Sequence, residues 1–257
     1  MGLNQNGLLK RSMDLFLTVS ALLLLWPVLL GLWILVRWRL GSPAIFCQVR
    51  PGWNERPITL YKFRTMTEER GSDGNLLSDG QRLTPLGRMM RNTSLDELPE
   101  LFNVLKGDLS LVGPRPLYTH YLPWYSQRER LRHAVKPGLT GLAQIHGRNY
   151  LPWNQRLSLD VWYVENWSLG LDVKILLKTV IMVLGRKGVA ANADDAETDL
   201  ALERGGDQAE AENCLAREGD GDPDDEENDL SFVKGDEVCA GMIPGERIGL
   251  NLGRGNP

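Results

Sequence analysis

Two adjacent carboxylates, Asp96 and Glu97, are the side chains of this sequence whose types and spacing best suit chemistry. Neighbouring residues on a helix point about 100° apart, so the two carboxylates cannot serve the same task. One could attack an electrophile or bind a metal while the other orients a proton or a metal-bound water. The structural alternative is that both acids lie in the first turn of a helix, where they satisfy free backbone amides and the helix dipole. The pair alone leaves both interpretations open.

Two basic segments rich in glycine or proline are suited to binding an anion. Residues 113–116 (GPRP) place Arg115 between prolines that fix the backbone, and arginine suits bidentate contact with phosphate. Residues 136–141 (KPGLTG), followed by Arg148 and Asn149, could bring backbone amides and a guanidinium close to an anion. Neither segment is a Walker loop, and no GxGxxG is present. The alternative for each segment is a tight turn with a solvated basic side chain.

The composition argues against several other kinds of site. Three cysteines without metal-like spacing and three isolated histidines disfavour a zinc site, a disulfide framework and a histidine-based triad. The chain of 257 residues is long enough to bury a core. Its net charge of −4 is the sum of two parts of opposite charge: residues 1–190 carry +10 and residues 191–257 carry −14. The basic part favours anionic partners such as phosphates, nucleotides, anionic lipid or nucleic acid.

The elements that must position these residues begin with an apolar run from Leu15 to Val36, long enough to span a bilayer. Pro27 follows Trp26 near its middle, and a proline inside a helix removes a backbone donor and kinks or breaks the helix. Basic residues flank both ends, so the positive-inside rule assigns both ends to the cytoplasm. These features predict a helix–break–helix hairpin that enters one leaflet and returns, with a kinked single-pass helix as the alternative.

After this run, the pattern predicts a strand hairpin and a helix that carries the acid pair. Residues 44–49 and 58–66 have the composition of two strands joined by a turn. Alternation along the second strand places Lys62 and Arg64 on one face. Residues 85–106 predict a helix from their apolar spacing.

The remaining segments are two further helices and an acidic tail. Ser94 is a possible N-cap in the helical segment 85–106, with Glu97 three residues later completing a capping box. Residues 128–133 predict a helix, and residues 172–187 predict an apolar one that lies either in the core or on a membrane surface. Residues 191–229 are rich in Asp, Glu, Gly and Ala and contain no aromatic residue, which predicts disorder.

The order of the motifs is specific. The proline-broken N-terminal segment is followed by YKFRTM (61–66), SLDELPELFNVLKGDLSLVGPRP (94–116), KPGLTGLAQIHGRN (136–149) and LDVWYVENWSLGLDVKILLKT (159–179). This order resembles the bacterial sugar transferase family, the small monotopic phosphoglycosyl transferases that initiate polyprenyl-linked glycan assembly. The resemblance covers residues 8–188 nearly without gaps and leaves the acidic tail outside it.

The resemblance implies a reaction and assigns residues to it. The substrates are then a UDP-sugar, expected to be N-acetylated, and polyprenyl (undecaprenyl) phosphate, with Mg²⁺ as the cofactor. Asp96 matches the family nucleophile, which attacks the β-phosphorus, expels UMP and forms a phosphosugar–aspartyl intermediate that the polyprenyl phosphate attacks. Asp96 and Glu97 are the expected metal ligands. The expected substrate contacts are Lys62, Arg64, Arg91, Arg115, Arg148 and Asn149, while Asp160 and Asp172 match family acids that are either near the substrate or structural ion-pair partners.

These expectations combine into one architecture. We expect an α+β, mostly helical, monotopic membrane protein with a re-entrant hairpin over 1–40, a small catalytic domain with amphipathic surface helices over 41–188 and an acidic tail over 189–257. The resemblance implies that the catalytic domain faces the cytoplasm at the bacterial inner membrane, touches one leaflet, supplies downstream glycosyltransferases and binds no nucleic acid. One alternative is a non-catalytic membrane-anchored scaffold, which does not explain the acid pair in a basic body. The other is an anionic-lipid-binding or nucleic-acid-binding protein, but the Arg and Lys residues are spread among loops, without a motif fold or an aromatic platform.

Overall fold

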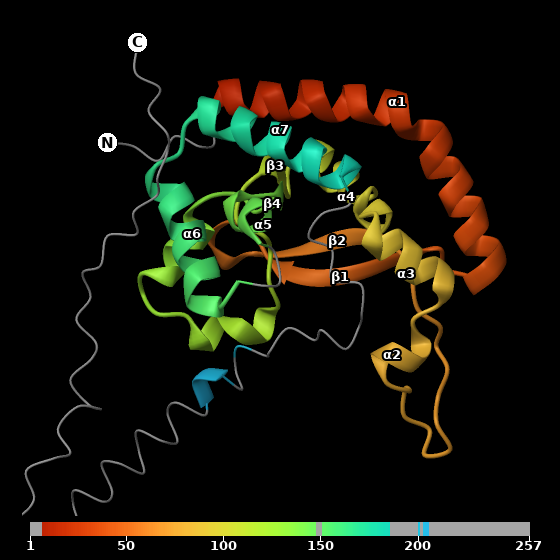
Figure 1. Cartoon of the computed structure of the whole chain (residues 1–257). Coiled ribbons are helices and arrows are strands. Elements are labelled where there is room, and N and C mark those ends of the chain that lie inside the picture. Colours follow the sequence, from red (N-terminus) through yellow and green to blue (C-terminus); the bar gives the residue numbers. More distant parts are fainter. Residues whose placement is uncertain (1–6, 148–150, 186–199, 201–202, 206–257) are drawn as a thin grey trace, which may run out of the picture. The chain divides into compact units, whose positions relative to one another are not determined.

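The computed structural model describes residues 7–147, 151–185, 200 and 203–205, which all belong to one compact unit, Met1–Gln208. Figure 1 shows a long N-terminal helix that runs over a body of short helices and two small sheets, so the described part has the expected mostly helical α+β character. The elements in chain order are α1 (Leu8–Leu40), β1 (Ile45–Pro51), η2 (Trp53–Glu55), β2 (Pro57–Phe63), α2 (Asp79–Arg82), α3 (Pro85–Asn92), η3 (Leu95–Glu97), α4 (Glu100–Lys106), β3 (Ser110–Val112), η4 (Thr119–Trp124), η5 (Glu129–Ala134), β4 (Gly138–Thr140), α5 (Leu142–His146), α6 (Trp153–Glu165) and α7 (Leu169–Leu184), where η denotes a 3₁₀ helix.

The N-terminal segment is one helix of 33 residues, α1, with Pro27 inside it. The helix is bent along its length (Figure 1). Pro27 accounts for the bend, because its ring crowds the preceding turn and its nitrogen donates no hydrogen bond. The sequence predicted two helices separated at Trp26-Pro27, whereas the structure has a single bent helix, since the leucine-rich flanks favour helix on both sides. The re-entrant path through one leaflet stays a prediction.

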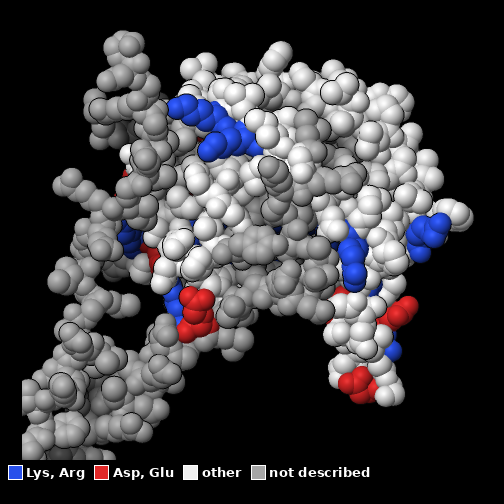
Figure 2. All heavy atoms as spheres, in the orientation of Figure 1, with Lys and Arg blue, Asp and Glu red and all other residues white. Residues whose placement is uncertain are grey.

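Most of the apolar surface of α1 is uncovered. Leu23, Leu24 and Trp26 are exposed, and among the described residues α1 is the one helix long and apolar enough to cross a membrane. Figure 2 shows mostly uncharged surface over α1 and α7, with basic side chains at its left and again at its right edge. Leu177 and Ile181 of α7 are also exposed. Apolar surface of this extent is typical of contact with a bilayer, which indicates that the protein is membrane-associated.

The first turns of α1 are fixed to the body by a buried polar network. Lys10 Nζ donates to Asp172 Oδ2 at 2.6 Å and to the carbonyl of Val112 at 3.1 Å. The Asp172 carboxylate also accepts hydrogen bonds from Tyr163 Oη at 2.7 Å and from Trp167 Nε1 at 3.0 Å. Asp172 is therefore the structural ion-pair partner that the sequence left as one of its two alternatives.

The predicted strand hairpin is confirmed. Residues 45–51 of β1 pair antiparallel with residues 57–63 of β2 over their whole length. Paired residues of an antiparallel ladder point to the same face, and every second residue shares that face. Gln48, Arg50 and Lys62 therefore lie on one face of the hairpin.

The segment predicted as helical over 85–106, with a possible N-cap at Ser94, is divided into α3, η3 and α4 in the structure. Ser94 has a left-handed backbone with φ 55°, and the short turn η3 carries Asp96 and Glu97 between α3 and α4. Ser94 makes no side-chain capping bond, so the predicted capping box is wrong. Thr93 contributes to the interruption, because its hydroxyl donates to a carbonyl in the last turn of α3 at 2.8 Å and so competes with continuation of the helix.

A pair of parallel strands, β3 and β4, supports the segment that carries Arg115. The N–H of Gly113 donates to the carbonyl of Thr140 at 2.9 Å, and the N–H of Gly138 donates to the carbonyl of Pro114 at 3.0 Å. A Cβ at Gly138 would lie 2.1 Å from the backbone nitrogen of Gly113. Only glycine allows the two chains to approach this closely.

Part of the acidic tail packs on the body. Leu200 is completely buried in a cluster with Tyr121 and Trp153. Arg204 forms a bidentate ion pair with Glu129, with N–O distances of 2.6 and 2.9 Å. A buried leucine and a paired arginine help offset the entropy of ordering the chain at these two positions. The rest of the predicted tail lies outside the described residues.

Candidate active site

The body contains a cleft of about 1,470 Å³. Its lining includes residues of the β1–β2 hairpin, α3, η3, α4 and α6, and of the segment that follows β3. Asp172 does not line it, because its carboxylate is enclosed in the network with Lys10. Arg148 and Asn149 lie outside the described residues. The cleft brings together the other predicted site residues, which are Lys62, Arg64, Arg91, Asp96, Glu97, Arg115 and Asp160.

Asp96 lies in η3 with 8% of its surface exposed. Burial raises the pKa of its carboxyl group and the neighbouring Glu97 raises it further, while Lys62, Arg91 and Arg115 act in the opposite direction. No described residue donates a hydrogen bond to its carboxylate. Asp96 is therefore a carboxylate near several positive charges. Its oxygens accept no hydrogen bond from the described residues.

Glu97 differs from its neighbour in its partners. Its Oε1 accepts from Arg115 at 2.6 Å and from Lys62 at 2.9 Å. Burial opposes ionisation of Glu97, but Arg115 and Lys62 outweigh burial and hold the pKa of this carboxyl well below its usual range. Glu97 is therefore ionised at any pH relevant to the cell and fixes both basic side chains in the cleft.

Glu100, the first residue of α4, is a third carboxyl group that sequence reasoning missed. It is 2% exposed, and its Oε1 forms an ion pair with Lys62 Nζ at 3.2 Å. Burial and the nearby Glu97 raise the pKa of Glu100 to about 7. The sequence did contain a signal for including Glu100 in the site. Glu100 follows Glu97 by three positions and Asp96 by four, and this spacing places side chains on one side of a helical segment.

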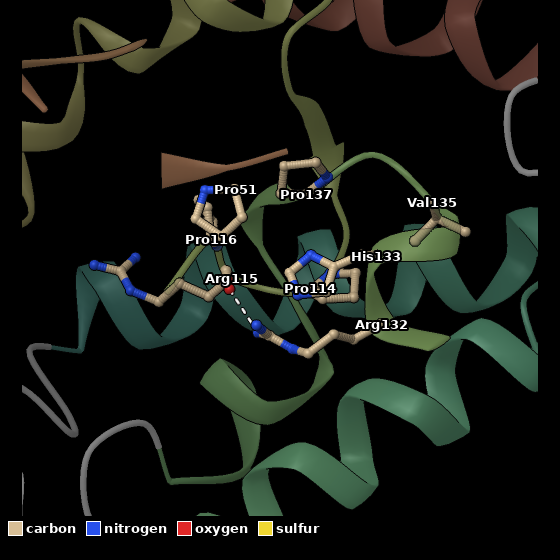
Figure 3. Close-up of a pocket in the computed structure, with 8 residues that line it drawn as sticks. All are labelled: Pro51, Pro114, Arg115, Pro116, Arg132, His133, Val135 and Pro137. Carbon is tan, nitrogen blue, oxygen red and sulfur yellow. Dashed lines mark hydrogen bonds between the residues drawn. The ribbon is translucent and has the colours of Figure 1, made fainter. Parts of the chain in front are cut away.

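Arg132 holds the backbone of Arg115 in place. The backbone carbonyl of Arg115 accepts from Arg132 Nη2 at 2.7 Å, and the same Nη2 donates to Asp160 Oδ2 at 2.7 Å. In Figure 3 the Arg115 side chain extends away from Arg132 while its carbonyl faces that guanidinium, beside the rings of Pro114 and Pro116. Asp160 is therefore an ion-pair partner that also lines the cleft.

The two remaining arginines have different surroundings. Arg91 Nε donates to the hydroxyl of Thr65 at 3.1 Å, which holds its guanidinium at the cleft wall. Arg64 Nη1 donates to the carbonyl of Ser42 at 3.2 Å, and its Nη2 forms an ion pair with Glu68. Part of the charge of Arg64 is thus compensated at the base of the hairpin, whereas Arg91 contributes positive charge near Asp96.

The residues present fit the magnesium ion that the resemblance implies. The described residues contain no cluster of three or more His, Cys, Asp or Glu placed to hold a metal. Mg²⁺ does not require such a cluster, because it is commonly held by one or two carboxylates together with substrate phosphates. Asp96 and Glu97 supply carboxylate oxygens beside a cleft lined by basic groups, which suits a metal that arrives with a phosphorylated substrate.

The chain resembles known proteins along most of its described length. A family model described as bacterial sugar transferase matches residues 5–186. The chain is 56% identical over 182 residues to the "uncharacterized sugar transferase EpsL" of Bacillus subtilis, which is 71% of this chain and 90% of that protein.

Two further relatives carry more specific names. Over 198 residues, the chain is 41% identical to the undecaprenyl-phosphate galactose phosphotransferase of Salmonella typhimurium. Over 185 residues, it is 40% identical to the UDP-glucose:undecaprenyl-phosphate glucose-1-phosphate transferase of Klebsiella pneumoniae. These matches cover 70% and 68% of this chain but only 41% and 40% of the two relatives. The family match and the identity to EpsL show that the chain belongs to the bacterial sugar transferases.

Proposed function

We propose that this transferase moves a phosphosugar from a UDP-sugar to polyprenyl phosphate, giving polyprenyl diphosphate-sugar and UMP. The observation that carries the proposal is Asp96, a buried carboxylate with Lys62, Arg91 and Arg115 around it in a large cleft. The Salmonella and Klebsiella relatives are named for transfer to undecaprenyl phosphate, which supports the same class of reaction here.

The reaction proceeds in two displacements at one phosphorus atom. A carboxylate oxygen of Asp96 attacks the β-phosphorus of the donor, the bond from that phosphorus to the bridging oxygen breaks, and UMP leaves. A phosphate oxygen of polyprenyl phosphate then attacks the phosphorus of the aspartyl intermediate and releases the carboxylate of Asp96. Dividing the transfer in this way lets two bulky substrates use one cleft in turn.

Charge neutralisation is the main task of the surrounding residues. Both substrates are anionic, and they must approach a carboxylate, so positive groups have to offset the repulsion. Arg115 and Lys62 already share Glu97, which fixes their positions and leaves donors on each for a phosphate. Asp96 and Glu97 would hold Mg²⁺, which would supply further neutralisation of the diphosphate.

The membrane arrangement is part of the same proposal. In it, α1 enters one leaflet and returns, since basic residues flank both ends of its apolar segment. The cleft then faces the cytoplasm at the inner membrane, where a polyprenyl phosphate headgroup reaches Asp96. The lipid-linked product stays in the bilayer and passes to downstream glycosyltransferases.

Release of UMP tests the reaction. Full-length protein in detergent, with Mg²⁺ and a panel of UDP-glucose, UDP-galactose and UDP-N-acetylhexosamines, should release UMP when polyprenyl phosphate is added. The panel also identifies the sugar, which the resemblance suggests to be N-acetylated and which the named relatives suggest to be glucose or galactose. A scaffold or a lipid-binding protein would release no UMP from any donor.

A further inference from the structure

The cleft contains a second group of polar and aromatic side chains that the proposed reaction does not use. Gln48 and Arg50 come from β1, and Tyr118 and His120 come from the start of η4. Arg50 shares a face of the hairpin with Lys62, so this group is continuous with the site of the carboxylates.

Arg50 is the most unusual member of the group. It is 8% exposed, and the centre of its guanidinium lies 3.5 Å from the ring centroid of Tyr118. Its Nη2 donates to Gln48 Oε1 at 2.8 Å, but its Nη1 is buried without an acceptor among the described residues. A buried donor without a partner costs free energy, so such a group calls for an acceptor supplied by something else.

The aromatic residues beside Arg50 form a stacked set. The rings of Tyr118 and His120 have centroids 5.2 Å apart and planes inclined by 22°. His120 in turn meets Tyr121 edge to face at 4.4 Å. Tyr118 and His120 are exposed and line the cleft, whereas Tyr121 is buried beneath them. The cleft therefore presents planar rings next to a guanidinium that is fixed in orientation.

The substrates of the proposed reaction differ in the groups that could contact a guanidinium and aromatic rings. The phosphosugar must lie at Asp96 to react, and polyprenyl phosphate carries an isoprenoid chain without planar rings. UMP, the leaving group, carries both a planar base with carbonyl oxygens and a phosphate. Arginine pairs with phosphate or carbonyl oxygens and packs flat on rings, which matches Arg50 to the nucleotide rather than to the lipid.

We propose that Arg50, Tyr118 and His120 form the subsite for the UMP portion of the donor. Arg50 donates a hydrogen bond to an oxygen of the nucleotide, on the α-phosphate or on the uracil ring, and the aromatic side chains pack against the base. This inference rests on the proposed function, because it takes a UDP-sugar as the donor.

Calorimetric titration of the full-length protein in detergent with UMP tests the subsite without turnover. Arg50→Lys keeps the charge but loses the planar donor group, and Tyr118→Leu removes an exposed ring. Each should raise the Kd for UMP by at least about tenfold, which corresponds to about 1.4 kcal/mol. Arg128→Lys is the matched control, because Arg128 is exposed, pairs with Glu165 and lies outside the cleft lining, and its Kd should stay within about twofold of wild type.

Titration with uridine separates the two acceptors. If Arg50 contacts the α-phosphate, Arg50→Lys weakens UMP binding and leaves uridine binding unchanged; if it contacts uracil, both weaken. Unchanged UMP affinity in both Arg50→Lys and Tyr118→Leu would overturn the subsite, and so would a wild-type protein that does not bind UMP. A wild-type protein that binds UMP yet releases none from any UDP-sugar would instead refute the proposed function. Thermal unfolding of each variant checks the fold, and the exposed position of Tyr118 keeps that variant informative if Arg50→Lys is destabilised.

Discussion

Asp96 and Glu97 are neighbours in the chain, but their surroundings assign them different roles. Glu97 accepts hydrogen bonds from both Lys62 and Arg115, so one of its oxygens is already occupied and its side chain is fixed. Asp96 interacts with basic groups through charge, without a described hydrogen bond. A nucleophile needs an accessible oxygen, whereas a positioning group needs fixed partners. These surroundings support the proposed attack by Asp96, with Glu97 holding Lys62 and Arg115 in place.

Asp96→Asn should abolish turnover and leave the fold intact. The amide has nearly the same size but lacks the anionic oxygen, so no aspartyl intermediate can form and we expect a loss of at least about 10³-fold in kcat. Incubation with labelled UDP-sugar followed by mass spectrometry should detect a phosphosugar adduct on wild type and none on the variant. An adduct mapped to any other residue would overturn the assignment.

Glu100→Gln should change how stability depends on pH. Because the pKa of Glu100 is raised from 4.5 to about 7, folded protein holds this proton more tightly than unfolded protein does. Its contribution to stability is therefore full below about pH 4.5 and is lost as the pH rises through about 7.

Glutamine resembles the protonated form, so Glu100→Gln should lack this loss. We expect it to match wild type near pH 4.5 and to exceed it at pH 8, by on the order of 1–3 kcal/mol. Urea unfolding across this range measures the difference, with the exposed Glu68→Gln as a control that should follow wild type. A variant less stable than wild type at pH 8 would contradict the raised pKa of Glu100.

At the residue scale, the sequence predicted more of the cleft than of its surroundings. Lys62 and Arg115 were placed with the acid pair from motif order, and they do converge on Glu97. Glu100 and Arg50 were missed, because their importance depends on which face of a helix or hairpin is turned toward the cleft. That orientation results from packing between segments distant in the chain, which local patterns do not contain.

At the scale of elements, strands were easier to predict than helix interruptions. The β1–β2 hairpin followed from turn residues and alternation, both of which are local. The possible N-cap at Ser94 marked the position of the interruption, but the left-handed backbone of Ser94 and the short turn η3 did not follow from the apolar spacing, which continues through residues 85–106. The interruption matters functionally, because it presents Asp96 and Glu97 from a short turn instead of from a helix face.

Pro27→Ala should alter the topology of α1 in the membrane. Without the proline, a straight helix of 33 residues would be about 50 Å long, enough to cross a hydrocarbon core of about 30 Å. A cysteine introduced at Asn4 should then move to the side opposite Cys47, which is exposed just after α1. Labelling with a membrane-impermeant reagent in inverted and right-side-out vesicles measures this.

Leu30→Ala is the matched control for this change, because it alters an exposed position of the same helix and keeps the proline. All variants carry the introduced cysteine at Asn4 and the native Cys47, with Cys214 and Cys239 replaced by serine. When Pro27 is kept, with or without Leu30→Ala, both cysteines should react from the cytoplasmic side. Reaction of the wild-type Asn4 position from the opposite side would show that α1 crosses the bilayer and that the re-entrant proposal is wrong.

At the scale of the whole molecule, the segment around Leu200 should stabilise the body. Leu200→Ala removes a fully buried side chain and should lower the free energy of unfolding by about 2–4 kcal/mol. Hydrogen exchange should increase in η4 and η5, where Tyr121 and Glu129 contact this segment. Leu215→Ala is the control for the same substitution elsewhere in the tail. Equal stability of Leu200→Ala and wild type would contradict a docked segment.

The buried pair of Lys10 and Asp172 has a consequence for how the protein is made. The two residues are 162 positions apart, so at about 5–20 residues per second the ribosome adds Asp172 roughly 8–30 s after Lys10. During that interval the nascent N-terminal helix carries Lys10 and Asp14 without their final partners. The two are four positions apart and neutralise each other on the helix surface. The helix can therefore take its final position only after the segment that carries Asp172, in α7, has emerged from the ribosome.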